Sequence, residues 1–176
     1  MKAIETTWNG HRFRSRTEAR WGVFLNALGI AFDYEPETYD LGEDGLYLPD
    51  FWLPLVSLRS YPDGLFLEVK GRESEDAERK PSALGKLLGL PVVVVYGPPA
   101  EHQEMIDRES VHEVAPYWDT TLFFYQCPHC LHVKVEFGDS NYMNCPHCGK
   151  EWAYLGLTER IEEAVRLSRS QRFGAH

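Results

Sequence analysis

The sequence has no apolar run long enough to span a bilayer. Its longest run, around residues 90–96, falls far short of the roughly 20 residues that a membrane helix needs. The chain begins MKAIETTW, without an apolar signal segment. It has no excess of positive charge either, since its formal net charge is −9. These absences predict a cytoplasmic protein without a membrane partner, and they disfavour a tight, non-specific binder of nucleic acid.

Cysteine is also scarce, and its four occurrences fall in two identical CPHC words, at Cys127, Cys130, Cys145 and Cys148. Without an export signal two disulfides are disfavoured, and paired CxxC words indicate a metal site. Four thiolates complete a tetrahedral Zn²⁺ site, so we expect a structural ion rather than a catalytic one. Three histidines in or beside the words could replace a thiolate, although four cysteines already suffice: His129, His132 and His147.

The segment between the two words alternates apolar and polar residues at Val133, Val135 and Phe137, and residues 138–141 are typical of a turn. The pattern predicts a hairpin held by the two words, resembling a zinc ribbon. A unit this small needs its ion in order to fold. Whether the ribbon contacts DNA, a protein partner or the rest of the chain is left open by the sequence.

The composition allows one domain of ordinary size and a small appendage, because the chain has 176 residues with 43% apolar and 13% aromatic residues. We place the main domain at residues 1–118, the zinc ribbon at 119–156, and a terminal helix and tail at 157–176. Charge is unevenly distributed: four arginines lie between positions 12 and 20, whereas positions 33–50 carry seven acidic residues and no basic one.

Residues 47–72 hold the densest group of chemically useful side chains. The words YLPDFWLP and LFLEVKGR read as two extended runs separated by a turn signal. Pairing of the runs would bring Asp50 beside Glu68. Lys70 shares a strand face with Glu68, because residues two apart project the same way. Two carboxylates and an ammonium suit a divalent cation and a phosphate.

Pro49-Asp50 followed by Glu68-Val69-Lys70 resembles the signature of the PD-(D/E)xK nuclease superfamily, whose fold is like that of restriction endonucleases. The words FRSRTEARW and YEPE stand where small bacterial and phage members carry similar words. The resemblance covers roughly residues 10 to 97. It implies an enzyme that hydrolyses DNA phosphodiester bonds and leaves a 5′-phosphate, without distinguishing exonuclease, endonuclease, junction-cleaving and end-cleaving types.

The resemblance also implies roles for particular residues. Asp50 and Glu68 would bind Mg²⁺ or Mn²⁺ together with the Val69 carbonyl, and Lys70 would orient or help deprotonate the attacking water. Glu18 would be a further ligand. Its spacing from Ser15 fits a helix-capping box equally well.

The N-terminal region is expected to form a hairpin at residues 3–14 with Asn-Gly at its tip, and then a helix over residues 15–29. A buried stripe of that helix is predicted at Trp21, Phe24, Leu25 and Leu28. Arg12, Arg14 and Arg16 are candidates for phosphate contact; a solvated face is the alternative.

The remaining pattern predicts an α/β fold with a mixed sheet of about four strands flanked by helices. We expect strands over residues 30–41 and 47–53, the second at a sheet edge or bulged at Pro49. A helix from near Pro81 to Gly89 would lead to a buried strand at 91–96, parallel to the strand of Glu68. A short helix is expected at 101–108, and a last amphipathic helix, packed back on the main domain, at 158–170.

Two functional hypotheses follow. The first is a divalent-metal-dependent nuclease that acts on DNA, for which a homodimer is compatible with double-strand cleavage. The alternative is a nuclease-like scaffold that binds DNA or a protein partner through the zinc ribbon without cutting. The acidic net charge favours the second hypothesis mildly, whereas the complete set of Asp50, Glu68 and Lys70 favours the first.

Overall fold

A computed structural model describes residues 4–58, 64–71, 77–100, 122–137, 142–153 and 159–174, and all structural statements below concern these residues. Three expected features lie outside them: most of the turn preceding Gly64, the short helix at 101–108 and the turn at 138–141.

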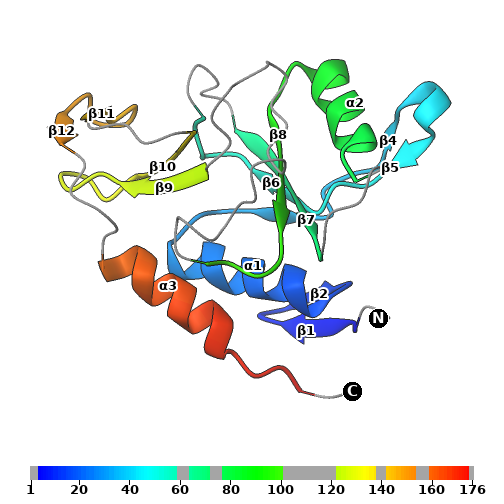
Figure 1. Cartoon of the computed structure of the whole chain (residues 1–176), viewed down its shortest axis with the longest axis horizontal. Coiled ribbons are helices and arrows are strands. Elements are labelled where there is room, and N and C mark those ends of the chain that lie inside the picture. Colours follow the sequence, from blue (N-terminus) through cyan, green and yellow to red (C-terminus); the bar gives the residue numbers. More distant parts are fainter. Residues whose placement is uncertain are drawn as a thin grey trace.

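The centre of the molecule is a four-stranded mixed sheet in the order β3-β6-β7-β8 (Figure 1), as the sequence predicts. β6 pairs antiparallel with β7, placing Phe51 opposite Leu67, and β8 runs parallel to β7. The strands are β3 (Asp33–Tyr34), β6 (Phe51–Leu53), β7 (Leu65–Lys70) and β8 (Val92–Tyr96). The expected buried parallel strand is therefore confirmed.

The sheet is covered on both faces by helices, α1 (Arg16–Ala27) and α2 (Arg79–Leu88). Leu65, Leu67 and Val69 belong to the same apolar core as the buried stripe of α1. Phe66 instead packs in a smaller cluster with Leu84 of α2. This alternation follows from the two-residue period of a strand. It sends Glu68 and Lys70 to the same side as Phe66.

The N-terminal hairpin joins β1 (Thr6–Trp8) and β2 (His11–Phe13) through Asn9 and Gly10, both with positive φ, as the Asn-Gly pair predicts. Phe13 lies against Gly22 of α1, where an added Cβ would come within 2.6 Å of the ring. The absence of a side chain at Gly22 thus lets the hairpin pack closely against α1.

Two strands that the sequence predicts as single elements are divided. Residues 30–41 form only β3 and β4 (Tyr39–Asp40), because Glu35 has a φ of 49° and Pro36 follows it. Residues 47–53 form β5 (Leu46–Tyr47) and β6, because Pro49 interrupts the strand. β5 pairs with β4, and the 3-10 turn η1 (Gly42–Asp44) connects them. β6 lies inside the sheet, so the expected edge position was wrong.

The cysteine-rich region forms two hairpins rather than one. β9 (Leu122–Gln126) pairs with β10 (Val133–Phe137), and β11 (Tyr142–Asn144) pairs with β12 (Glu151–Ala153). The predicted hairpin between the CPHC words was therefore wrong, because each word itself reverses the chain and pairs the strands on its two sides.

The first of these hairpins packs into the main core. Phe124, Val133 and Val135 belong to the apolar cluster that also holds Phe24 of α1. The Val135 N–H donates a hydrogen bond of 3.2 Å to the Ser57 carbonyl. The contact between the cysteine-rich region and the rest of the chain, which the sequence left open, is thus present. The division at residues 118 and 156 stays a prediction.

The terminal helix α3 (Glu159–Ser170) packs beside α1 (Figure 1), as expected. Its buried face is Ile161, Ala164 and Val165. Arg160 donates a 2.6 Å hydrogen bond to the carbonyl of Leu28 at the end of α1, and Arg20 donates one of 2.7 Å to the Arg169 carbonyl. None of the helices within the described part of the chain is long and apolar enough to cross a membrane.

Candidate functional site

The residues that the sequence singles out around the PD…EVK motif line one cleft of about 530 Å³. β7 contributes Glu68, Val69 and Lys70, the segment just before β6 contributes Asp50, and the first turn of α1 contributes Glu18. The structure therefore brings residues from both faces of the sheet to one opening.

Asp50 and Glu68 are interlocked through the backbone of their strands. The Asp50 N–H donates to Glu68 Oε2 at 3.2 Å, and the Val69 N–H donates to Asp50 Oδ2 at 2.7 Å. Both side chains are buried, at 3% exposure each. The break at Pro49 permits this arrangement, because it frees the Asp50 N–H from the strand ladder.

The environment of Asp50 disfavours its negative charge. Burial raises the pKa of Asp50 to about 8, and the charges of Glu68 and Glu18 act in the same direction. The Val69 N–H and the Arg14 guanidinium oppose this rise in pKa. Three carboxylates meet in this cleft, those of Asp50, Glu68 and Glu18, and carboxylate oxygens are ligands that Mg²⁺ and Mn²⁺ prefer.

Lys70 and Arg14 supply the positive charge of the cleft. Lys70 Nζ lies 2.5 Å from Glu68 Oε1. The Arg14 guanidinium lies 2.7 Å from Asp50 Oδ1 and 2.6 Å from Glu35 Oε1. Each carboxylate is thus paired with a cation of the chain itself.

Glu18 lines the cleft, and its side chain also takes part in capping its own helix. Its Oε1 accepts from the Ser15 hydroxyl at 2.7 Å, and its Oε2 accepts from the Tyr34 hydroxyl at 2.6 Å and from the Arg14 N–H at 3.1 Å. The Ser15 hydroxyl in turn accepts from the Glu18 N–H. A role for Glu18 as a metal ligand stays a prediction.

The three arginines of the basic stretch have different surroundings. Arg14 enters the cleft, whereas Arg12 pairs with the exposed Glu5 and Arg16 is exposed on the first turn of α1. Lys80, which the sequence analysis did not include among the site residues, also lines the cleft and donates to the Leu46 carbonyl at 2.8 Å.

Three further side chains lie at the site that the sequence analysis did not assign to it. Glu35 pairs with Arg14, and Tyr34 donates to Glu18; burial raises the pKa of Tyr34 well above its usual range, and the bond to Glu18 adds to the rise. Both residues belong to the YEPE motif, which was the available sequence signal for their place at the site.

The third is Tyr47, which lines the cleft and is only 7% exposed. Its buried hydroxyl has no hydrogen-bond partner among the described residues. Burial raises the pKa of this phenol strongly, and the charge of Glu68 raises it further. No local pattern in the sequence marks it.

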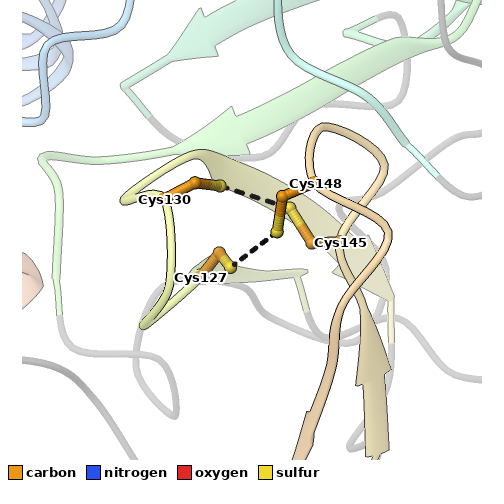
Figure 2. Close-up of side chains that lie close together, drawn as sticks. All are labelled: Cys127, Cys130, Cys145 and Cys148. Atoms are coloured by element: carbon orange, nitrogen blue, oxygen red, sulfur yellow. Dashed lines mark hydrogen bonds between the residues drawn. The ribbon is translucent and has the colours of Figure 1, made fainter.

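The four cysteines form a second cluster, held at the turns of the two C-terminal hairpins (Figure 2). Their sulfur atoms all lie within 4.8 Å of one another. The pairs Cys127–Cys148 and Cys130–Cys145 are separated by 3.7 and 3.6 Å, far beyond the disulfide length of about 2.05 Å. The cysteines are free and placed to hold a metal ion, while the rings of His132 and His147 stack on each other nearby.

The chain is similar to Endodeoxyribonuclease 1 of Enterobacteria phage T3, with 37% identity over 79 residues. The matched region is 40% of this chain and 43% of the phage protein, so the chain covers less than half of that relative. No protein-family model matches the chain, and no solved structure matches it.

Proposed function

We propose that this protein is a divalent-metal-dependent nuclease that hydrolyses DNA phosphodiester bonds. The observation that carries the proposal is the interlocked pair of Asp50 and Glu68, with Lys70 beside it, in one open cleft. The partial similarity to a phage endodeoxyribonuclease supports the same class of reaction. A cytoplasmic location and DNA as the substrate belong to this proposal.

In this proposal Asp50 and Glu68 hold Mg²⁺ or Mn²⁺ with the Val69 carbonyl, and Glu18 acts as a further ligand from α1. The donor set fits, because the buried carboxylate oxygens of Asp50 and Glu68 are the kind of ligand that a hard cation prefers. The bound ion supplies Lewis-acid polarisation and a more acidic water. Lys70 orients that water and stabilises negative charge on the phosphate, while Arg12, Arg14 and Arg16 contact the DNA backbone.

For the cysteine cluster we propose a different role, that of a structural zinc site. Four sulfur ligands from two CxxC turns suit a closed tetrahedral Zn²⁺ site with no position for water. The ion is therefore structural, and it ties the two C-terminal hairpins to each other.

The experiment is cleavage of supercoiled plasmid, linear duplex and single-stranded DNA in Mg²⁺ or Mn²⁺. Asp50→Ala and Lys70→Ala should each lower the rate by about a thousandfold, as expected when several kcal/mol of transition-state stabilisation are lost. Lys86→Ala is the matched control, because Lys86 is exposed on α2 and does not line the cleft. Cutting that survives Asp50→Ala would refute the site assignment.

The form of the products addresses oligomeric state. A homodimer that places one cleft on each strand would convert supercoiled plasmid directly to linear DNA. A monomer would give nicked circles first. Specific DNA binding by the wild type without cutting on any substrate, in either metal, would instead support the scaffold hypothesis.

A further inference from the structure

All four oxygens of the Asp50–Glu68 pair already have a partner from the chain. Backbone N–H groups occupy Asp50 Oδ2 and Glu68 Oε2, and these are held by the pairing of β6 with β7. Side chains occupy the other two oxygens: Arg14 at Asp50 Oδ1 and Lys70 at Glu68 Oε1. A cation that binds this pair must therefore compete with Arg14 and Lys70.

Among the described residues, Arg14 has a second carboxylate partner, whereas Lys70 has none. The Arg14 Nε lies 2.6 Å from Glu35 Oε1, and the Glu35 N–H donates to the Asp50 carbonyl at 2.8 Å. Glu35 has a φ of 49°, in the left-handed region that residues with a side chain rarely adopt. The fold thus holds Glu35 in a strained conformation that places its carboxylate beside Asp50.

We propose that Arg14 is an internal counter-ion that Asp50 exchanges for the divalent cation. We further propose that Glu35 is a positioning residue, which keeps the released guanidinium at the rim of the cleft for a substrate phosphate. This inference rests on the proposed function. The guanidinium has five N–H donors in a planar fork, so its Nε can stay on Glu35 while the terminal nitrogens turn from Asp50 to a phosphate. Half of the Arg14 side chain is already exposed.

The exchange couples cation binding to DNA binding. Without DNA, the cation must break the Arg14–Asp50 ion pair and leave the guanidinium with one carboxylate partner instead of two. With DNA, a phosphate replaces Asp50 as the second partner. Each ligand therefore raises the affinity for the other by the same factor, as thermodynamic linkage requires.

The first test is calorimetric titration of Mn²⁺ into the full chain without DNA. Arg14→Gln should tighten Mn²⁺ binding by about fivefold or more, because the competing cation is removed. Arg166→Gln is the matched control, since Arg166 pairs with Glu163 on the surface of α3 and does not line the cleft. Asp50→Ala identifies the heat that belongs to this site.

The second test is DNA binding by fluorescence anisotropy in Mn²⁺, with all proteins carrying Lys70→Ala to prevent cutting. Arg14→Gln should weaken DNA binding by about fivefold or more, the opposite direction from its effect on Mn²⁺. Glu35→Gln should also weaken DNA binding, although the loss of an acidic charge alone would strengthen it. In the Arg14→Gln background, Glu35→Gln should no longer weaken DNA binding, because Glu35 acts through Arg14.

Unchanged or weaker Mn²⁺ binding in Arg14→Gln, with Asp50-dependent binding in the wild type, would overturn the exchange and leave the proposed function standing. Stronger DNA binding by Glu35→Gln would overturn the positioning role of Glu35. A wild type that binds no Mn²⁺ at an Asp50-dependent site would overturn the proposed function, and the exchange with it.

Discussion

The cleft around Asp50 and the cluster of four cysteines hold potential metal ligands in opposite ways. The cysteine sulfurs come from two turns, lie within 4.8 Å of one another and have no cation of the chain between them among the described residues. The carboxylates of Asp50 and Glu68 are each paired with a cation of the chain, and with Glu18 they do not converge as closely as the cysteines do. One cluster is closed, whereas the other opens into a cleft of about 530 Å³.

A closed cluster suits a structural metal ion, whereas an open cleft suits a metal ion that takes part in a reaction. A structural ion needs every position filled by protein, because its binding energy contributes to folding. An ion that takes part in a reaction needs open positions for water and substrate, so its ligands must tolerate its absence. The cations paired with Asp50 and Glu68 provide that tolerance by partly neutralising the buried carboxylates.

The largest effect that we expect is the loss of DNA cleavage when a chelator removes the divalent cation but leaves the zinc bound. Brief treatment with EDTA should lower DNA cleavage by at least about a thousandfold, and added Mg²⁺ should restore it, because the carboxylate site is open to exchange. Zinc content, measured by atomic emission on the same desalted protein, should not change. Parallel loss of zinc and activity would mean that the two sites are not distinct in this way.

Removal of a thiolate should affect stability most. Cys145→Ser should abolish zinc binding and lower the free energy of unfolding by at least about 3 kcal/mol, since structural zinc contributes strongly to folding. The buried Cys145 holds the second hairpin to the first. His129→Ala is the control within the first CPHC word, because His129 is exposed and outside the sulfur cluster. Thermal denaturation and zinc content both report the outcome.

The cysteine-rich region can also be weakened without touching its metal ligands. Phe124→Ala should cost about 3–5 kcal/mol of unfolding free energy, the usual range for a buried phenylalanine. Phe124 is 4% exposed and packs edge-on against Phe24 of α1, at 5.1 Å between ring centroids. Leu131→Ala, at a side chain 59% exposed, should change stability by no more than about 0.5 kcal/mol. Equal effects in chemical denaturation would contradict the packing of the first hairpin into the core.

The smallest expected effects are changes in stability at two tyrosines of the cleft. We expect these two changes to have opposite signs. Tyr34→Phe should destabilise the metal-free protein by about 1–2 kcal/mol, because the buried Glu18 carboxylate loses the hydrogen bond that the Tyr34 hydroxyl donates to it. Tyr47→Phe should stabilise it by about 1 kcal/mol, because it removes a buried hydroxyl that has no hydrogen-bond partner among the described residues. Urea denaturation of both variants without metal gives the comparison. Destabilisation by Tyr47→Phe would show that its hydroxyl is hydrogen-bonded in solution.

The sequence predicted those parts of the fold that depend on local patterns. Ser15 caps α1, the stripe containing Trp21 is buried, and the Asn-Gly turn joins the first two strands, as expected from cap chemistry, the 3.6-residue period and turn stereochemistry. The pairing of the strand after Asp50 with the strand of Glu68 followed from the extended runs and the turn signal between them. Errors arose where strand patterns were read as continuous, at Glu35 and Pro49.

The sequence by itself determined which chemical groups are present and which neighbours share a face: Glu68 with Lys70, and the cysteines of each CPHC word. These follow from short-range geometry, in which a strand repeats every two residues and a four-residue turn brings its ends together.

Only the tertiary structure decided that Arg14 pairs with Asp50 and Glu35, that the Tyr47 hydroxyl has no hydrogen-bond partner among the described residues, and that the two CPHC motifs belong to separate hairpins. These contacts join segments far apart in the chain. They depend on strand register and on the packing of α1 against the sheet, which no local pattern encodes.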